Sequence, residues 1–123
     1  ILVDGFDPDA KAGVLDTAPF YQACRSRLSD DGICSINLLG RNRGFQGSVE
    51  RLKAAFDGRV AVFPSCDSGN TIAFATGGNP VDLGLDEMRA RAEQLKKDSR
   101  LNLLPTIGRL QLSHPLPDGR LHI

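Results

Sequence analysis

The stretch ILVDGFDPDA, residues 1–10, starts with an apolar run and ends in carboxylates. Ile1 to Val3 are short, apolar and partly β-branched, which predicts a buried strand. The turn-forming sequence that follows breaks the strand sharply, so that Asp4 and Asp7 come directly after it. In open α/β sheets, ligands bind beyond the carboxyl ends of parallel strands. These two aspartates are therefore the first candidates for a binding site.

Outward from this stretch, apolar runs alternate with amphipathic segments. We expect strands at 1–3, 33–39, 60–63 and 71–75 and helices at 18–28, 45–56 and 85–97. Only seven residues separate the third strand from the fourth, which is too few for a crossover helix, so these strands should be antiparallel. The order β-α-β-α-β-β-α predicts an α/β fold, with a mostly parallel sheet, helices on both faces and an antiparallel last strand.

The helices and the end of the chain carry finer expectations. Asp16 or Thr17 can cap the first helix, and each helix has an apolar stripe. The stripes are Phe20, Cys24 and Leu28, then Phe45, Val49, Leu52 and Phe56, then Leu85, Met88, Ala92 and Leu95. Residues 101–107 are expected to pack on the core. Residues 113–123 read as a loosely held tail.

Composition excludes several classes of protein. At 123 residues, with 41% hydrophobic and 24% charged residues, the chain has the size and make-up of one globular domain. Net charge is zero, which gives no electrostatic case for nucleic acid or an anionic membrane. No apolar run approaches the roughly 20 residues of a membrane helix. The three cysteines have no metal-site spacing, so we expect reduced thiols in a cytoplasmic protein.

Three places follow predicted strands and could carry chemistry: Asp4 with Asp7, then Asn37, then the segment 66–70. The acidic segment 1–16 suits a cationic ligand, although aspartates around a turn are also common on plain surfaces. Asp7 could instead cap its own loop through an Asx turn. Asn37 could satisfy backbone groups at the strand end, and the segment 66–70 could be a plain turn. No third ligand near the two aspartates supports a metal site.

Taken together, these pieces resemble the C-terminal half of the catalytic domain of spermidine synthases, the polyamine aminopropyltransferases. The resemblance covers residues 1–77 and, more loosely, the helix at 85–97. It rests on the apolar run with D-x-x-D-P at 1–8, Leu15 with Phe20-Tyr21, Leu28 with Gly32, Asn37, and Ser68-Gly69. It implies a Rossmann-like fold of the class I S-adenosylmethionine-dependent methyltransferases, with residues 1–99 in the catalytic domain and 100–123 as an extension or tail.

The resemblance also implies roles for individual residues. Asp4 matches the acid that contacts the amine of the aminopropyl donor, decarboxylated S-adenosylmethionine, and serves as general base. Asp7 matches an acid that lies near the acceptor, a diamine such as putrescine. The further implications are a small-molecule amine substrate, no permanently bound cofactor or metal, a cytoplasmic location and a homodimer.

Several positions depart from the family pattern on the acceptor side. Asn37 stands where a glutamine contacts the diamine, and Cys66 followed by Asp67 stands where a tyrosine covers the substrate. Gly5-Phe6 replaces a small polar pair and is expected to put a bulky ring beside the site. These departures favour a second hypothesis, a methyltransferase-like relative with another acceptor.

The family's glycine-rich cofactor loop is absent from this sequence. We therefore expect a fragment that is inactive alone and that exposes the edge of its first strand. A third hypothesis is a non-catalytic domain used for dimerisation.

Overall fold

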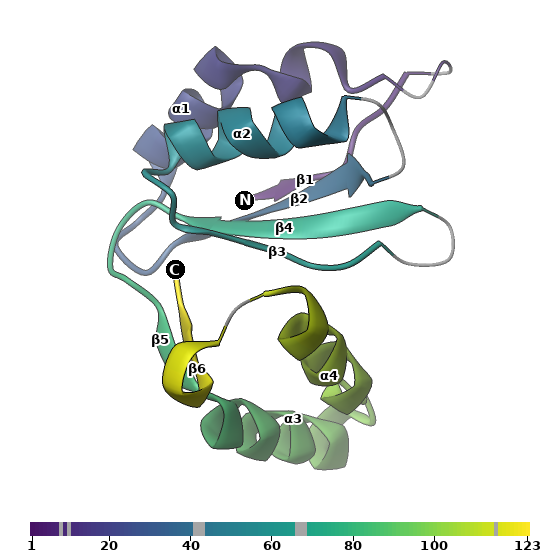
Figure 1. The fold of residues 1–123 in the computed structure, drawn as a ribbon, viewed down its shortest axis with the longest axis vertical. Helices are drawn as coiled ribbons and strands as arrows, with labels where there is room; N and C mark the ends of the chain where they lie inside the picture. Colours follow the sequence, from purple (N-terminus) through teal and green to yellow (C-terminus); the bar gives the residue numbers. More distant parts are fainter. Residues whose placement is uncertain (8, 10, 41–43, 66–68, 115) are drawn as a thin grey trace.

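The computed structural model describes residues 1–7, 9, 11–40, 44–65, 69–114 and 116–123. Its main sheet contains, in spatial order, β1 (Leu2–Val3), β2 (Ile33–Leu39), β4 (Asn70–Thr76) and β3 (Val60–Val62). β1 and β2 are parallel, and β4 runs antiparallel to both β2 and β3. The predicted antiparallel relation of the third and fourth strands is confirmed. β4 lies between β2 and β3, so β1, β2 and β3 all end at the same edge of the sheet (Figure 1).

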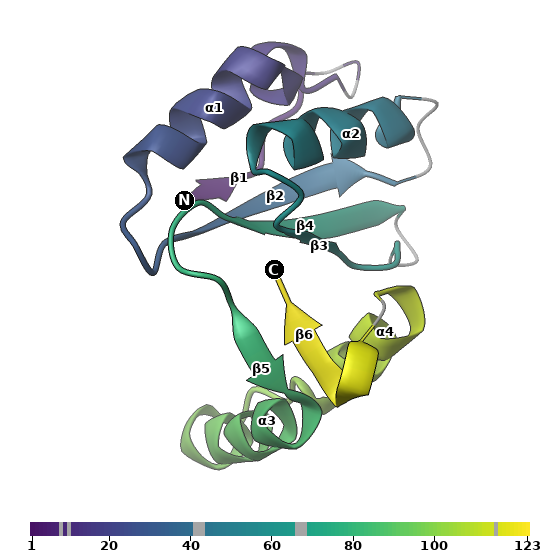
Figure 2. The ribbon, with the colours of Figure 1, turned by 60° about the vertical axis from the view of Figure 1, so that its left-hand side comes forward.

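Helices cover both faces of this sheet, as the sequence predicts (Figure 2). α1 (Ala18–Arg27) and α2 (Phe45–Ala55) lie on one face. α3 (Leu85–Ser99) and α4 (Leu104–Ser113) lie on the other. Thr17 is the N-cap of α1, where its Oγ1 accepts from the backbone N–H of Phe20 at 3.4 Å. An α/β architecture with a mixed sheet is thus established.

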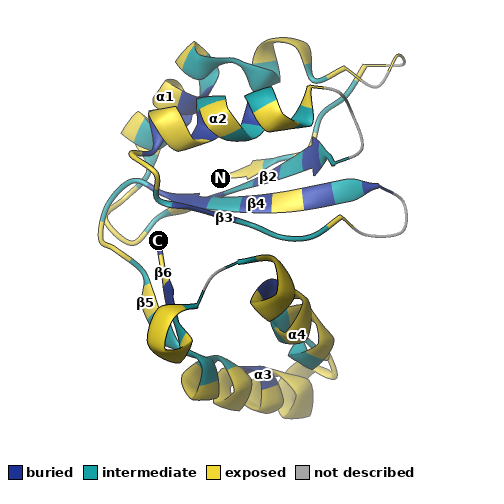
Figure 3. Cartoon of the chain, in the orientation of Figure 1, coloured by how far each residue is buried: buried dark blue, intermediate teal, exposed yellow. Residues whose placement is uncertain are grey.

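The principal core lies between the sheet and α1 and α2. Alternate residues of β2 point into it, and the remaining ones face the opposite layer. Its fully buried large side chains include Tyr21, Leu52 and Phe56. The apolar stripes of the first two helices are confirmed, although Tyr21, one position from the predicted stripe, is the most deeply buried residue of α1. Figure 3 shows the contrast between the buried strands and the largely exposed outer surfaces of α3 and α4.

The expectation of a loosely held tail at 113–123 is wrong. After a short 3₁₀ turn (Pro117–Gly119), β6 (Arg120–His122) pairs antiparallel with β5 (Asp82–Gly84). Leu121 and Ile123 are each only 8% exposed. They join a second apolar cluster with Ala61 and Leu110, which links the sheet to the C-terminal layer. The partner strand lies about forty residues earlier, so the local sequence carries no sign of this pairing.

The turn at Gly77-Gly78 ties β4 to the loop that follows α1. Arg59 donates to the carbonyl oxygens of both glycines, and the N–H of Asn79 donates to the carbonyl of Asp30 at 2.6 Å. A Cβ atom at position 78 would overlap the backbone of Asp30. That backbone cannot move aside as the tip of a flexible side chain could.

We therefore expect Gly78→Ala to lower the free energy of unfolding by about 2 kcal/mol. Gly108→Ala in α4 is the matched control, because nothing lies within 4 Å of a Cβ there. It should raise the free energy of unfolding by about 0.5 kcal/mol through helix propensity. Urea unfolding of both variants measures the difference, and equal stabilities would contradict the predicted overlap.

Candidate functional site

The candidate site lies where β1 and β2 end side by side. Val3 is in register with Ile36, so the next residues along each strand, Asp4 and Asn37, are neighbours at the sheet edge. The side-chain amide of Asn37 donates through Nδ2 to Oδ1 of Asp4 at 3.0 Å. The structure thus brings together two of the residues singled out from the sequence, and one of them holds the carboxylate of the other.

The second polar atom of Asn37 has no partner. Its Oδ1 is buried and accepts no hydrogen bond from any residue that the structure describes. Buried acceptors are normally satisfied, so each exception needs a reason. Next to a carboxylate, an unsatisfied amide oxygen can accept a hydrogen bond from a cationic or neutral N–H group. The pair offers acceptors on both residues to such a donor.

Asp7 has a role in its own loop. Its Oδ1 accepts from the backbone N–H groups of Asp9, at 2.9 Å, and Lys11, at 2.8 Å. Its own N–H donates to the carbonyl of Lys11 at 2.9 Å. The Asx-turn alternative is therefore confirmed for this oxygen. Within the described residues, no hydrogen bond joins Asp7 to Asp4 or Asn37. The role of its other oxygen toward a ligand stays a prediction.

The third predicted place can be followed only in part. Cys66, Asp67 and Ser68 lie outside the described residues. Gly40, just past β2, donates its N–H to the carbonyl of Gly69 at 2.8 Å. The end of β2 and the start of β4 are therefore joined at the edge that carries Asp4 and Asn37.

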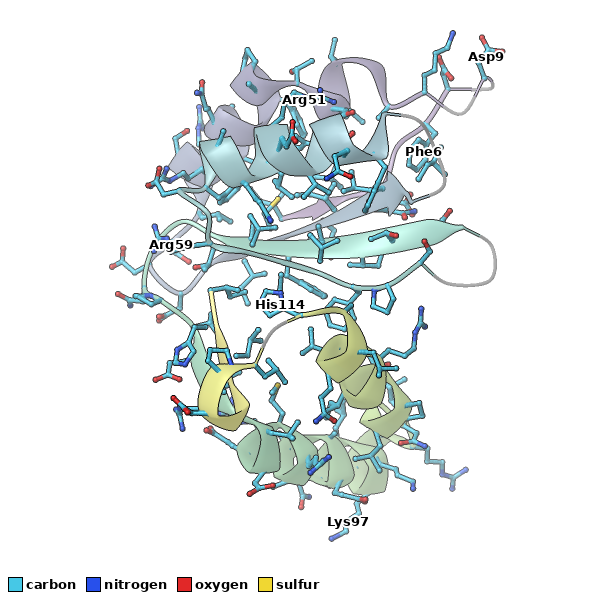
Figure 4. The ribbon with its side chains drawn as sticks, viewed as in Figure 1. Phe6, Asp9, Arg51, Arg59, Lys97 and His114 are labelled. Atoms are coloured by element: carbon cyan, nitrogen blue, oxygen red, sulfur yellow. The ribbon has the colours of Figure 1, made fainter. Side chains whose placement is uncertain are left out.

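The ring of Phe6 lines a cavity of about 190 Å³ together with Lys11, Asp16 and Leu38. Leu38 and Asn37 are consecutive in β2, so their side chains project to opposite faces of the sheet. The cavity therefore reaches the face that carries α1 and α2. The sequence predicted that this ring lies beside Asp4 and Asp7. In the structure Phe6 lines this cavity, and neither aspartate belongs to the described lining. Figure 4 shows Phe6 at the end of the sheet where β1 finishes.

Asp16 was one of two candidates for the cap of α1, but Thr17 is the N-cap and Asp16 has a structural role that sequence reasoning missed. Its carboxylate accepts from the hydroxyl of Tyr21 at 2.8 Å, the hydroxyl of Ser48 at 2.6 Å and Nη2 of Arg51 at 2.6 Å. Burial and the Asp16 carboxylate raise the pKa of Tyr21 far above its usual value, so that this phenol stays neutral. The cluster fixes the 3₁₀ segment Gly13–Asp16 against α1 and α2. No local signal connects Asp16 to residues more than thirty positions away.

Other classes of site are not found in the described part of the chain. It contains no group of three or more histidine, cysteine, aspartate or glutamate side chains that could hold a metal ion. None of its helices is long and apolar enough to cross a membrane. Cys24 and Cys34 are buried free thiols, and burial raises the pKa of Cys34 to about 11. That thiol is therefore unsuited to nucleophilic chemistry near neutral pH.

Known proteins resemble this chain over all 123 of its residues. Two proteins from Neisseria meningitidis, of serogroups A and B, are each 32% identical to it, and one from Chromobacterium violaceum is 31% identical. All three carry the name polyamine aminopropyltransferase. The chain is a relative of the polyamine aminopropyltransferases. The matched residues make up 47% of each of these proteins, so the chain spans about half the length of its aminopropyltransferase relatives.

Two further comparisons found nothing. No family model matches the chain, and no solved structure matches it. Kinship with the aminopropyltransferases therefore rests on the three curated relatives.

Proposed function

We propose that the chain is part of a spermidine synthase-like transferase that moves an aminopropyl group from decarboxylated S-adenosylmethionine to an amine acceptor. The observation that carries this proposal is the pair at the ends of β1 and β2. A carboxylate, Asp4, is held by Asn37, whose own Oδ1 has no partner among the described residues. The names of the curated relatives support the reaction class. The activity is proposed for the whole protein, to which these residues contribute the carboxylate.

The proposed reaction needs a proton acceptor near the attacking amine. The nitrogen lone pair of the acceptor attacks the aminopropyl carbon next to the sulfonium, the carbon–sulfur bond breaks, and its electron pair returns to sulfur. Methylthioadenosine leaves as a neutral thioether. The attacking amine must be unprotonated, and the new secondary amine must shed a proton. Asp4 is the group that we assign to accept that proton.

The acidic loop supplies the electrostatics for a cationic acceptor. Asp4, Asp7 and Asp9 are all exposed within six residues, and within the segment 4–11 Lys11 is the one basic residue of the sequence. Lys11 Nζ lies 3.9 Å from Asp9, and both side chains are more than 70% exposed, so this pair is weak. The net negative charge of the loop favours an ammonium group near the strand ends.

A second candidate is a methyltransferase-like enzyme with a different acceptor. One observation favours it: Oδ1 of Asp7, the residue expected to hold the diamine, is occupied by two backbone N–H groups of its own loop. Asn37 is also one methylene shorter than the glutamine of the family pattern. Both features alter the acceptor side and leave the pair of Asp4 and Asn37 in place.

Calorimetry on the protein encoded by the complete gene separates these readings. We expect micromolar binding of decarboxylated S-adenosylmethionine and diamine-dependent release of methylthioadenosine, measured by mass spectrometry. Putrescine and longer or shorter diamines then identify the acceptor. Tighter binding of ordinary S-adenosylmethionine, with methyl transfer, would replace the first reading by the second. Binding of neither nucleoside would leave a non-catalytic domain.

A further inference from the structure

A cavity of about 520 Å³ lies along the outer edge of β3, the strand at the opposite edge of the sheet from β1. Its walls come from three parts of the chain: α2, the edge strand β3 and the segment that follows α4. Apolar side chains form much of this lining, among them Phe45, Val49 and Val62. We call this space the β3 cleft.

Three basic side chains line the same cleft. Lys53 of α2, His114 after α4 and His122 of β6 all line the β3 cleft, and these are the two histidines of the chain. Figure 4 shows His114 between the sheet and the C-terminal layer. No carboxylate belongs to the described lining. Asp82, which lies outside this lining, accepts from Nε of Arg120 at 2.7 Å and lies 3.4 Å from Nδ1 of His122.

The edge strand adds backbone donors. Phe63 donates its N–H to Ile72 of β4 at 2.9 Å, and Arg59 accepts from Thr76 of β4 at 3.2 Å. Successive residues of a strand direct their backbone groups to opposite sides, so the intervening Val60 and Val62 face outward. Val60 donates to Gly58. The N–H of Val62 therefore faces the open edge that borders the β3 cleft.

We propose that the β3 cleft binds a small organic anion, a carboxylate or phosphate ester attached to an apolar group. Lys53, His114 and the N–H of Val62 face the anionic end. The side chains of Phe45 and Val49 contact the apolar body. Among the described residues, no carboxylate lines the cleft beside Lys53, so its charge is available to a ligand there.

Binding is expected to take up a proton. Burial and the Lys53 ammonium hold the pKa of His114 below its usual range, so its ring is neutral at pH 7 in the empty cleft. An anion between the two groups favours the protonated ring and raises that pKa. The other ionisable groups nearby, His122 with Asp82 and Arg120, already interact with one another. Affinity should therefore rise as the pH falls.

The test uses the histidine ring signals of the chain in NMR titrations with benzoate and with phenyl phosphate. Benzyl alcohol serves as the neutral probe of matching shape. We expect both anions to shift the His114 and His122 signals saturably and to raise the titration midpoint of His114. Affinity should be several-fold tighter near pH 6 than near pH 8. A larger effect of phenyl phosphate would identify a phosphate ester as the preferred class, and a larger effect of benzoate a carboxylate.

Variants provide the control. Lys53→Gln should weaken anion binding about tenfold, as expected for the loss of a charge-assisted contact. Lys96→Gln removes the same charge from the exposed face of α3 and should change nothing. Three results would overturn the proposal: no saturable shift with up to about 10 mM of either anion, equal shifts with benzyl alcohol, or unchanged affinity in Lys53→Gln.

Discussion

Asp4→Asn is expected to lower kcat/KM for aminopropyl transfer by about 100-fold or more, the usual loss on removing a general base. Asparagine keeps the shape of the side chain and can still pair with Asn37, so the strand ends should stay in place. What disappears is the atom that accepts the proton of the attacking amine. The measurement is the rate of methylthioadenosine release by the protein from the complete gene, with saturating donor.

Asp9→Asn is the matched control for this effect. It removes the same charge from the same loop, but the Asp9 carboxylate pairs only with Lys11 among the described residues. The contact of Asp9 with Asp7 is made by its backbone N–H, which the substitution keeps. Its rate should stay within about twofold of the unmodified protein, because exposed charges interact weakly. If both variants lose activity equally, Asp4 acts through the field of the loop and the assignment of the base is wrong. A pH–rate profile distinguishes a general base from an effect of the loop's charge, since loss of a base changes how the rate falls at low pH.

Asp16→Ala is expected to lower the free energy of unfolding by about 3 kcal/mol. It leaves the hydroxyl of Tyr21, the hydroxyl of Ser48 and the guanidinium of Arg51 without their shared acceptor. Tyr21 is fully buried, so its hydroxyl cannot turn to water instead. Urea unfolding measures the loss, with near-ultraviolet circular dichroism reporting whether the environment of Tyr21 has changed.

Tyr21→Phe gives the comparison within the same cluster. It removes one donor and leaves the acceptor satisfied by Ser48 and Arg51, so about 1 kcal/mol should be lost. The double variant should lose less free energy of unfolding than the sum of the two single variants, because both substitutions remove the same hydrogen bond. Strict additivity would show that the carboxylate stabilises the fold through Ser48 and Arg51 alone.

Much of the fold was predictable because its signals are local. The apolar run at 33–39 and the stripe from Phe45 to Phe56 depend on side chains at fixed spacing. The run at 1–3 also forms a strand, but the expectation that it is buried is wrong: Ile1 and Leu2 are exposed, because β1 is an edge strand. The antiparallel pairing of β3 with β4 followed from the length of one connection. Two strands joined through a helix are expected to be parallel, so Asp4 and Asn37 could be placed at one edge before the structure was known.

The residues that the sequence could not place act through distant partners. Whether the Asp7 carboxylate is free for a ligand or caps its own loop depends on the conformation of that loop. In the structure its Oδ1 accepts from the backbone N–H groups of Asp9 and Lys11. β6 was mistaken for a tail because a three-residue strand has almost no pattern of its own until β5 pairs with it. Lys53, His114 and His122 look unrelated along the chain and share one cavity in the fold.

By itself, the sequence determined the four strands of the main sheet, their directions, the helices α1 to α3 and the kinship with the polyamine aminopropyltransferases, since periodicity and motif spacing are properties of short segments. It did not predict α4, β5 or β6. Only the tertiary structure decided that Asp16 joins two helices, that Asp7 serves its own loop and that a cleft lined by Lys53 and both histidines borders β3. Each of these depends on hydrogen bonds or cavity walls made by residues that meet only when the helices pack on the sheet. The free energy of that packing is a sum over many weak contacts, and no single segment encodes it.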